Sequence, residues 1–443
     1  MGRSALVGAV GALVLVLLGG TAEAGPRLRK GPYLQNLTPS SITVMWEVDE
    51  RVPATVVVTG GGGERRVRSG SDEIAEVVVD GLQPATRYTY RVEFEGDGPS
   101  GKPNLTGEFA TAPPLGTPGP LSFVVFGDTR SNADSHRRVM DRAAAEIPDF
   151  VLGTGDMVDE GHREDQWQTY FDVERDVLRN NVLFPSLGNH DRQGRGRTAD
   201  TYRALFAVPE NSPNPERYYA FSYGHARFLV LDSNSHSFAL TDQTSWLESE
   251  LIAARQDARV RHIFVVMHHP PFSISLHGGQ RDLRERWTPL FEQYQVTAVF
   301  SGHDHVYSRA EHNGIRYFVT GGGGAPLYPR SQRATALDKK AVVTFERVLH
   351  YLRVHLHGDQ VEVSAIRVDG TAIETISWGE PPRPAGPASA TAPVPQSAPA
   401  VGAPAPGLRG PASPGRGGFG WLGALGVAAA LVAAVVMVRA LRS

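Results

Sequence analysis

The stretch Leu121-Ser122-Phe123-Val124-Val125-Phe126-Gly127-Asp128 is an apolar run that ends on a glycine and a carboxylate. Its valines and phenylalanines predict a buried strand with a polar residue at its end. Four more short polar motifs follow apolar runs: Gly155-Asp156, Gly188-Asn189-His190-Asp191, Met267-His268-His269 and Gly302-His303-Asp304-His305. Ligands usually bind where parallel strands end. We therefore expect one edge of one sheet to gather all five motifs.

The region around this stretch alternates between two kinds of pattern. Between residues 119 and 378, apolar β runs alternate with helical periodicity at 136–145 and 244–255, which is typical of an α/β domain. The end of the region is all β, in the runs 315–320, 348–354 and 361–363. Mixed strands of this kind indicate two stacked sheets with helices outside them.

The preceding region, residues 26–114, shows short alternating β runs separated by glycine-rich turns. About seven such runs predict an all-β sandwich. The pattern Leu82-x-Pro84-x-Thr86-x-Tyr88 is similar to the tyrosine-corner segment of fibronectin type III modules, and Trp46 stands where their core tryptophan packs. We expect a fibronectin-like sandwich here, and an unrelated β domain is the alternative.

The composition limits the classes of function. The chain has 443 residues, 41% of them apolar and 21% charged, which is usual for a folded soluble protein. A net charge of −3 provides no basic stripe for nucleic acid. The absence of cysteine excludes disulfides, cysteine-bound zinc and a cysteine nucleophile. A phosphorylated small molecule or protein remains open as substrate, and the oligomeric state is open too.

The first 24 residues have the features of a signal peptide. Arg3 precedes an apolar stretch at 5–18, and Ala22-Glu23-Ala24 fits the small-x-small cleavage rule. We expect the mature chain to begin near Gly25. An exported protein without disulfides suits a bacterial cell envelope.

The C-terminal residues form two further segments. Residues 379–416 are rich in Pro, Ala and Ser, which is typical of an extended linker. Residues 419–438 are twenty uncharged residues, about the length that crosses a bilayer as a helix. We expect a single transmembrane helix; a buried core helix and a sorting tail that is later cleaved are the alternatives. The predicted location is the cell envelope, with the chain either membrane-anchored or processed at its C-terminus.

The polar motifs together hold nitrogen and oxygen donors suited to metal ions. Hydrolysis of a phosphoester needs a water deprotonated near neutral pH and positive charge at the phosphoryl oxygens, and two metals ~3.5 to 4 Å apart supply both. We predict Asp156 as the bridging ligand. The other predicted ligands are Asp128 and His305 for one metal, and Asn189, His268 and His303 for the other. This set suits Fe, Mn or Zn.

These motifs resemble those of the calcineurin-like metallophosphoesterases, and of the purple acid phosphatase branch in particular. The fourth motif has the pattern Val265-Val266-Met267-His268, and Gly31-Pro32-Tyr33-Leu34-Gln35-Asn36 is similar to the start of the module that precedes the catalytic domain in that branch. The resemblance covers residues 30–378. It implies an αββα catalytic sandwich, a dinuclear centre, and hydrolysis of phosphate monoesters by attack of a metal-bound hydroxide.

The chain departs from the family pattern at two positions. Most of the superfamily has a histidine two residues after the first aspartate, where this chain has Arg130. The purple branch instead uses a tyrosine three residues after the second motif's aspartate, where this chain has Asp159, so we expect no purple colour. One first-site ligand is therefore missing. Asp159, His136, or an extra water with weaker metal binding are the alternatives.

Other motif residues are candidates for contact with substrate. Arg130 is predicted to clamp phosphate, with an outward surface arginine as the alternative. His190 matches the family's substrate-side histidine, and we expect Asp191 to orient it for protonation of the leaving oxygen. Because the Val-x-x-His pattern selects His268 as ligand, His269 is expected beside the ligands or the substrate.

Two residues outside the motifs extend the predicted pocket. His277 lies in a loop next to Gly278-Gly279 just after the fourth motif, where it can reach substrate; a surface histidine is the alternative. Tyr307 follows the fifth motif and is predicted to line the pocket wall.

The predicted function is that of an exported, metal-dependent phosphatase. A phosphodiesterase acting on nucleotides or phospholipid headgroups uses the same chemistry and is the first alternative. A cell-surface binding protein whose first metal site has decayed is the second.

Overall fold

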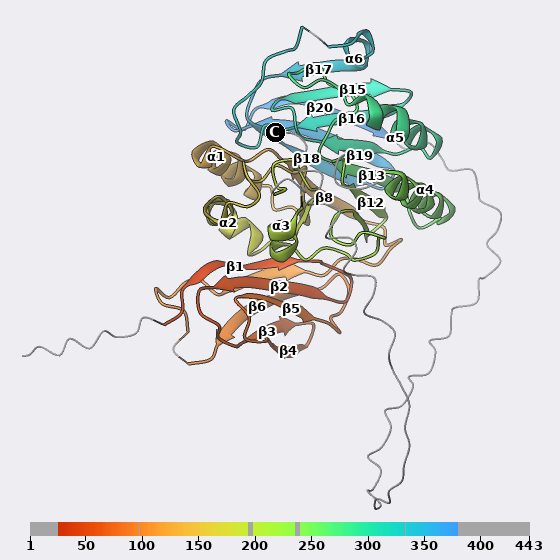
Figure 1. Ribbon diagram of the computed structural model, residues 1–443. Coiled ribbons are helices and arrows are strands. Elements are labelled where there is room, and N and C mark those ends of the chain that lie inside the picture. Colours follow the sequence, from red (N-terminus) through yellow and green to blue (C-terminus); the bar gives the residue numbers. More distant parts are fainter. Residues whose placement is uncertain (1–24, 97, 194–197, 235–239, 333, 380–443) are drawn as a thin grey trace, which may run out of the picture. The chain divides into compact units, whose positions relative to one another are not determined.

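The computed structural model describes residues 25–379 apart from 97, 194–197, 235–239 and 333 (Figure 1). The predicted signal peptide at 1–24, the transmembrane helix at 419–438 and all of the linker after residue 379 lie outside the described residues and stay predictions. Within the described ranges, no helix is long and apolar enough to cross a membrane.

Residues 28–110 fold into two antiparallel sheets that share a core. One has the order β1(Leu28–Gln35), β2(Ile42–Val48), β5(Ile74–Val79). The other has the order β4(Gly63–Arg68), β3(Ala54–Gly60), β6(Arg87–Phe94), β7(Thr106–Ala110). The expected all-β character of this region is therefore confirmed.

Trp46 is buried in this core and its ring lies 5.8 Å from that of Phe94. The backbone N–H of Gln83 donates to the Tyr88 hydroxyl at 2.8 Å, a contact of the tyrosine-corner kind. The relation to fibronectin modules stays a prediction that these contacts favour.

The second region contains two stacked sheets. The six-stranded sheet has the order β10(Leu183–Pro185), β9(Phe150–Gly153), β8(Pro120–Phe126), β18(His350–His357), β19(Gln360–Arg367), β20(Ala372–Gly379). The seven-stranded sheet has the order β11(Tyr219–Tyr223), β12(Ala226–Leu231), β13(His262–Met267), β14(Ala298–Ser301), β16(Ile315–Thr320), β15(Tyr307–His312), β17(Val342–Glu346). Strands β8, β9 and β10 are parallel, as are β12, β13, β14 and β16.

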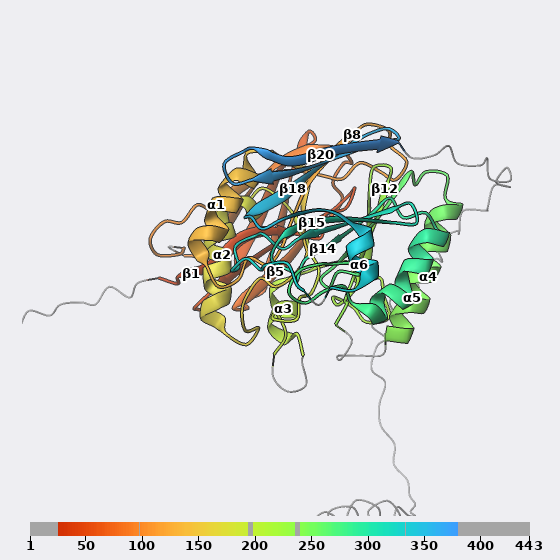
Figure 2. The same ribbon diagram turned by 90° about the horizontal axis from the view of Figure 1, so that it is seen from above.

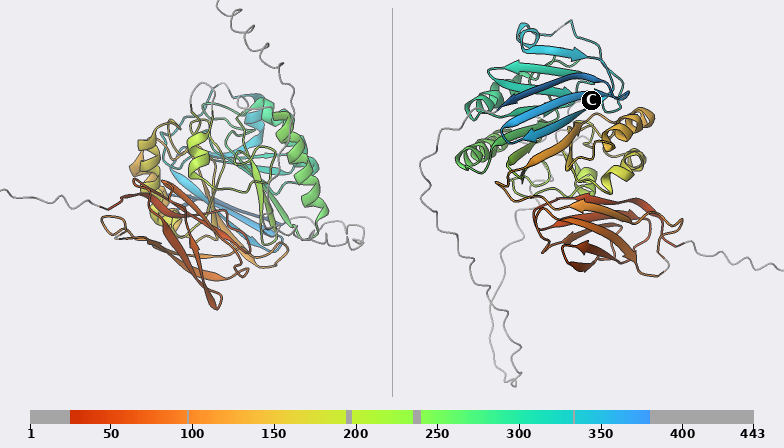
Figure 3. Two further views of the ribbon diagram at one scale, coloured as in Figure 1. Left: turned by 60° about the horizontal axis from the view of Figure 1, so that its bottom comes forward. Right: turned by 180° about the vertical axis from the view of Figure 1, so that it is seen from behind.

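Helices cover the outer face of each sheet, so the region has four layers (Figures 2 and 3). Helices α1(Ala133–Ala144) and α2(Glu164–Leu178) pack beside the six-stranded sheet, and α4(Leu240–Gln256) and α5(Arg281–Gln293) beside the seven-stranded one. Two short helices, α3(Asp200–Leu205) and α6(Ala336–Ala341), lie in connections. The predicted α/β fold is confirmed, and the helices start a few residues before the predicted segments.

Strand alternation explains the layers. In β8, Phe123 faces the core between the sheets, where its ring meets Phe264 at 5.5 Å and Phe300 at 6.1 Å. The neighbouring Val124 and Phe126 face the core beneath α1 and α2. Because successive side chains of a strand point to opposite faces, a continuous apolar run fits a sheet that is covered on both sides.

The N-terminal sandwich packs against α2 of the second region (Figures 1 and 3). The buried ammonium of Lys30 in β1 contacts both Glu47 of β2 and Glu164 at the start of α2. The hydroxyl of Tyr33 donates to the carbonyl oxygen of Leu205 at 2.8 Å. Strand β1 is therefore joined to the second region by buried polar contacts as well as by apolar packing.

Candidate metal centre

The five motifs meet where strands of both sheets end. Three of them follow β8, β9 and β10 of the six-stranded sheet, and two follow β13 and β14 of the seven-stranded sheet. The expectation that one sheet edge gathers them was therefore wrong, because the two stacked sheets each contribute. Backbone hydrogen bonds join the loops, from Asp128 N to Gly155 O at 2.9 Å and from Gly302 N to His268 O at 2.9 Å.

Glycines allow this close approach. A Cβ atom on Gly188 would lie 2.2 Å from both the backbone nitrogen and Oδ1 of Asp156, and one on Gly302 would lie 2.4 Å from Oδ2 of Asp128. Any side chain at these positions would occupy the space of a candidate ligand.

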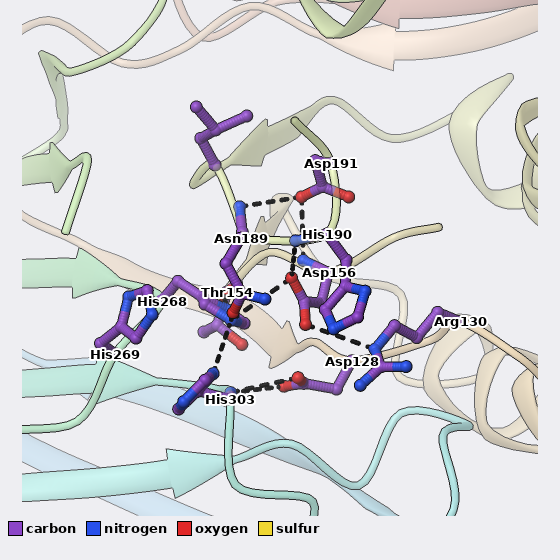
Figure 4. A network of polar contacts seen from close by, with 12 residues as sticks. Asp128, Arg130, Thr154, Asp156, Asn189, His190, Asp191, His268, His269 and His303 are labelled. Carbon is purple, nitrogen blue, oxygen red and sulfur yellow. Dashed lines mark hydrogen bonds and ion pairs between the residues drawn. The ribbon is translucent and has the colours of Figure 1, made fainter. Parts of the chain in front are cut away.

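One group of donor atoms converges on Nε2 of His268. This atom lies 3.0 Å from Asn189 Oδ1, 3.2 Å from His303 Nδ1 and 3.3 Å from Asp156 Oδ1 (Figure 4). Nδ1 of His268 is 2.8 Å from the carbonyl oxygen of Thr154, which can only accept, so Nδ1 carries the hydrogen. When Nε2 is deprotonated, its lone pair faces the other donors, as in metal-binding histidines.

A second group consists of Asp128, Asp156 and His305, whose donor atoms all lie within 4.8 Å of one another. His305 Nε2 is 3.4 Å from Asp128 Oδ1, and its Nδ1 donates to the carbonyl oxygen of Pro326 at 2.7 Å. All three side chains are buried. The two groups share Asp156, and their nitrogen and oxygen donors fit two metal ions.

The electrostatics of the buried groups favour a cation. Burial lowers the pKa of His268, but the Asp156 carboxylate outweighs burial and raises that pKa to about 9. For Asp156, burial raises the pKa, and His268, His190 and Arg130 together hold it well below its ordinary value. Negative potential therefore concentrates at Asp156, where positive charge from any source is stabilised.

Arg130 points into the site. Its Nε lies 3.3 Å from Asp156 Oδ2 (Figure 4). Its Nη2 lies 3.4 Å from His305 Nε2. Its Nη1 donates to Asp159 Oδ1 at 2.8 Å. The structure thus has the inward arrangement that a phosphate clamp requires.

Asp191 does not have the expected contact with His190. Its carboxylate accepts the backbone N–H groups of Asp156 at 2.9 Å, Met157 at 2.8 Å and Gly188 at 2.8 Å. The ring of His190 is instead oriented by the carbonyl oxygen of Asp159, 2.7 Å from Nδ1. Asp191 therefore holds the second and third motifs together, and burial beside Asp156 raises its pKa to about 6.

Neither predicted replacement for the missing ligand joins a donor group. His136 on α1 is buried and its Nε2 lies 2.7 Å from Glu174 Oε1 on α2, so it pairs within the helix layer. Asp159 is closer to the site, but its carboxylate accepts from Arg130 and Ser131.

His269 and His277 lie beside the donor group that converges on His268. A ring nitrogen of His269 falls in one cluster with those of His268 and His303, and its Nδ1 is 2.9 Å from Ser233 Oγ. The exposed His277 has its ring 4.3 Å from that of His303, and its backbone N–H donates to Asp304. Both side chains are therefore within reach of a substrate.

The prediction that Tyr307 lines the pocket wall was wrong. It is fully buried on β15, and its hydroxyl donates to Glu374 of β20 at 2.6 Å. Its place in the strand alternation directs it between the sheets and away from the pocket. Tyr328 was missed: its ring stacks on that of His305 at 4.0 Å, and no motif in its loop indicated this.

Known proteins that are similar to this chain agree with this geometry. A family model described as calcineurin-like phosphoesterase matches residues 121–307. The chain is 31% identical to tartrate-resistant acid phosphatase type 5 of Mus musculus over 243 residues, which cover 46% of this chain and 72% of that protein. The chain belongs to the calcineurin-like phosphoesterases. Its predicted resemblance to the purple acid phosphatase branch is confirmed.

Three further matches were found for this calcineurin-like phosphoesterase. Residues 25–108 match a family described as a domain of unknown function (DUF7800). An uncharacterized protein of Mycobacterium tuberculosis is 29% identical over 294 residues, 58% of this chain and 54% of that protein, so the chain spans about half of its length. The structure of a purple acid phosphatase from yellow lupin (Lupinus luteus) seeds has a TM-score of 0.65 at 18% identity, covering 80% of this chain and 74% of that one, and supports the fold.

Proposed function

We propose that this protein hydrolyses phosphate monoesters with two metal ions held at the junction of its two sheets. The observation that carries the proposal is the pair of donor groups that share the buried Asp156, with the Arg130 guanidinium beside them. Two metals in these positions supply a water of lowered pKa and positive charge for the phosphoryl oxygens.

The chain's own residues bind substrate and move a proton. The Arg130 guanidinium has a planar set of N–H donors that matches phosphate oxygens. His190 is half-buried, and its Nδ1–H is held by the Asp159 carbonyl oxygen, which leaves Nε2 to exchange a proton with the leaving oxygen. His269 and His277 offer further donors at the rim.

The first test measures metal content and p-nitrophenyl phosphate turnover in the full chain and in Asp156→Asn. We expect close to two metals per wild-type chain, and a loss of at least about 100-fold in turnover in the variant, because the shared ligand is lost. Asp134→Asn is the matched control, since that side chain is 96% exposed on α1. Equal turnover in wild type and Asp156→Asn would rule the site out.

The same preparation separates the alternatives. Faster hydrolysis of bis(p-nitrophenyl) phosphate than of the monoester, at equal metal loading, would favour a phosphodiesterase. No turnover of either ester after loading with Mn, Zn or Fe would favour a binding protein. Export to the cell envelope is part of the proposal, supported by the pattern of residues 1–24 and tested by cell fractionation.

A further inference from the structure

Arg130 contacts donor atoms of the group formed by Asp128, Asp156 and His305, which is called the first metal position below. Its guanidinium lies 3.3 Å from Asp156 Oδ2 and 3.4 Å from His305 Nε2, and these residues belong to the same donor group. The His305 contact uses a lone pair, because Nδ1 of that ring already donates to the Pro326 carbonyl oxygen. A metal at this position needs the same nitrogen lone pair and the same carboxylate.

A guanidinium and a divalent metal cannot both hold these atoms. Arginine stays protonated in proteins, so its charge cannot be removed to make room for the metal. Two cations at one carboxylate also repel each other, most strongly where water is excluded. The Arg130 side chain is only 12% exposed and that of Asp156 only 1%.

A second anchor for the guanidinium is already in contact with it. Nη1 of Arg130 donates to Asp159 Oδ1 at 2.8 Å, and Ser131 donates to the same carboxylate. A cavity of about 160 Å³ adjoins this contact, lined by Arg130, Asp159, His136 and Tyr170 among others. The side chain therefore has both an anion and space on the side away from the donor group.

We propose that Arg130 competes with the metal ion that binds at the group of Asp128, Asp156 and His305. This metal ion enters only when the guanidinium withdraws from Asp156 and His305 towards Asp159. The protein then binds its two metals with unequal affinity, tightly at the His268 group and weakly at the His305 group. This inference rests on the proposed function, because it assumes the two metal positions. The released guanidinium is also the group that is free to bind phosphate.

The test is a Mn²⁺ titration of the metal-free full chain by calorimetry and equilibrium dialysis, which needs no turnover. Wild type should bind in two steps whose dissociation constants differ by about 100-fold or more. Arg130→Gln, neutral and of similar length, should tighten the weaker step by at least about tenfold. Arg130→Lys keeps the charge and should remain closer to wild type, and Arg137→Gln on the surface of α1 is the matched control. His268→Ala should remove the tight step.

Asp159 provides an independent check through a double-mutant cycle. Asp159→Asn should weaken the first metal further, because Arg130 loses its alternative anchor, and should have no effect in the Arg130→Gln background. If Asp159 were a ligand, its loss would weaken binding in both backgrounds, and the proposal would be wrong.

The outcomes also distinguish this inference from the function on which it rests. Two steps of equal affinity in wild type, or an unchanged weaker step in a folded Arg130→Gln protein, would overturn the competition and leave the phosphatase proposal intact. No metal binding to any folded variant would overturn both. Circular dichroism of each variant shows whether it is folded.

Discussion

At the scale of single residues, the centre depends on unusual backbone conformations. Asp128, Asp156 and His303 have φ angles of 56°, 56° and 69°, in the left-handed region that costs about 1 to 3 kcal/mol for a residue with a side chain. Each comes directly after a glycine that lies just beyond the end of a strand. The surrounding hydrogen bonds hold these residues there, which aims their side chains at common points.

A prediction at this scale concerns Gly188. Gly188→Ala would place a Cβ 2.2 Å from backbone and side-chain atoms of Asp156, so the shared ligand must move. A shift of about 1 Å at a catalytic group costs on the order of 100-fold in rate, and we expect that loss in turnover together with weaker metal binding.

Gly63→Ala is the matched control, because no atom lies within 4 Å of the position of its Cβ and its φ is not in the left-handed region. Retention of wild-type turnover by Gly188→Ala would contradict the packing of the third motif against Asp156.

At the scale of elements, strand β13 has a buried histidine at its start, and the candidate metal ligand His268 follows its end. His262 at its start is buried, and its Nε2 lies 2.7 Å from the Gly358 carbonyl oxygen. Burial lowers the pKa of His262 to about 4, and the neighbouring His225 adds to this effect. The metal-binding His268 follows the other end of the strand.

The resulting prediction is a loss of stability on acidification. Above about pH 6.5 His262 is neutral in both states, whereas between pH 6.5 and 4 the unfolded chain takes up a proton that the folded one does not. Stability should therefore fall across this window by up to about 3 kcal/mol. In His262→Gln, which can still donate to Gly358, the unfolding midpoint should depend less on pH.

His162→Gln is the control, because that side chain is 59% exposed. An identical pH dependence in wild type and His262→Gln would contradict the buried neutral state of His262.

At the scale of the whole molecule, the N-terminal sandwich and the catalytic region are joined at Lys30. The side chain of Lys30 is 0% exposed and that of Glu47 is 11% exposed, so the pair is almost entirely removed from water. Removing one partner of a buried pair leaves the other charge without compensation.

We expect Lys30→Met to destabilise the protein by about 3 to 5 kcal/mol, measured by thermal and denaturant unfolding. Part of this loss should be recovered in Lys30→Met with Glu47→Gln. Arg51→Met removes an exposed pair with Glu73 and should cost about 0 to 1 kcal/mol. A Lys30→Met protein as stable as wild type would mean that the contacts of Lys30 with Glu47 and Glu164 add nothing to the stability of the protein.

Local sequence patterns were sufficient to predict the strands and their polar ends. Side chains in the run before Gly127-Asp128 point alternately into two cores. This apolar run was enough to predict a strand and a ligand position at its end. The roles of Asp191 and Tyr307 did not follow, since adjacency in sequence does not show where a side chain points. Asp191 is next to His190 but its carboxylate accepts backbone N–H groups of the second motif.

The order of residues was enough to indicate the two-sheet fold, the donor set and the family, because hydrophobic periodicity and short motifs are properties of neighbouring residues. The tertiary structure was needed to show that both sheets contribute residues to the site and that the Arg130 guanidinium contacts Asp156 and His305. The pairs Arg130–His305 and His136–Glu174 are separated by 175 and 38 residues. Such contacts arise from packing of distant segments, for which no local pattern exists.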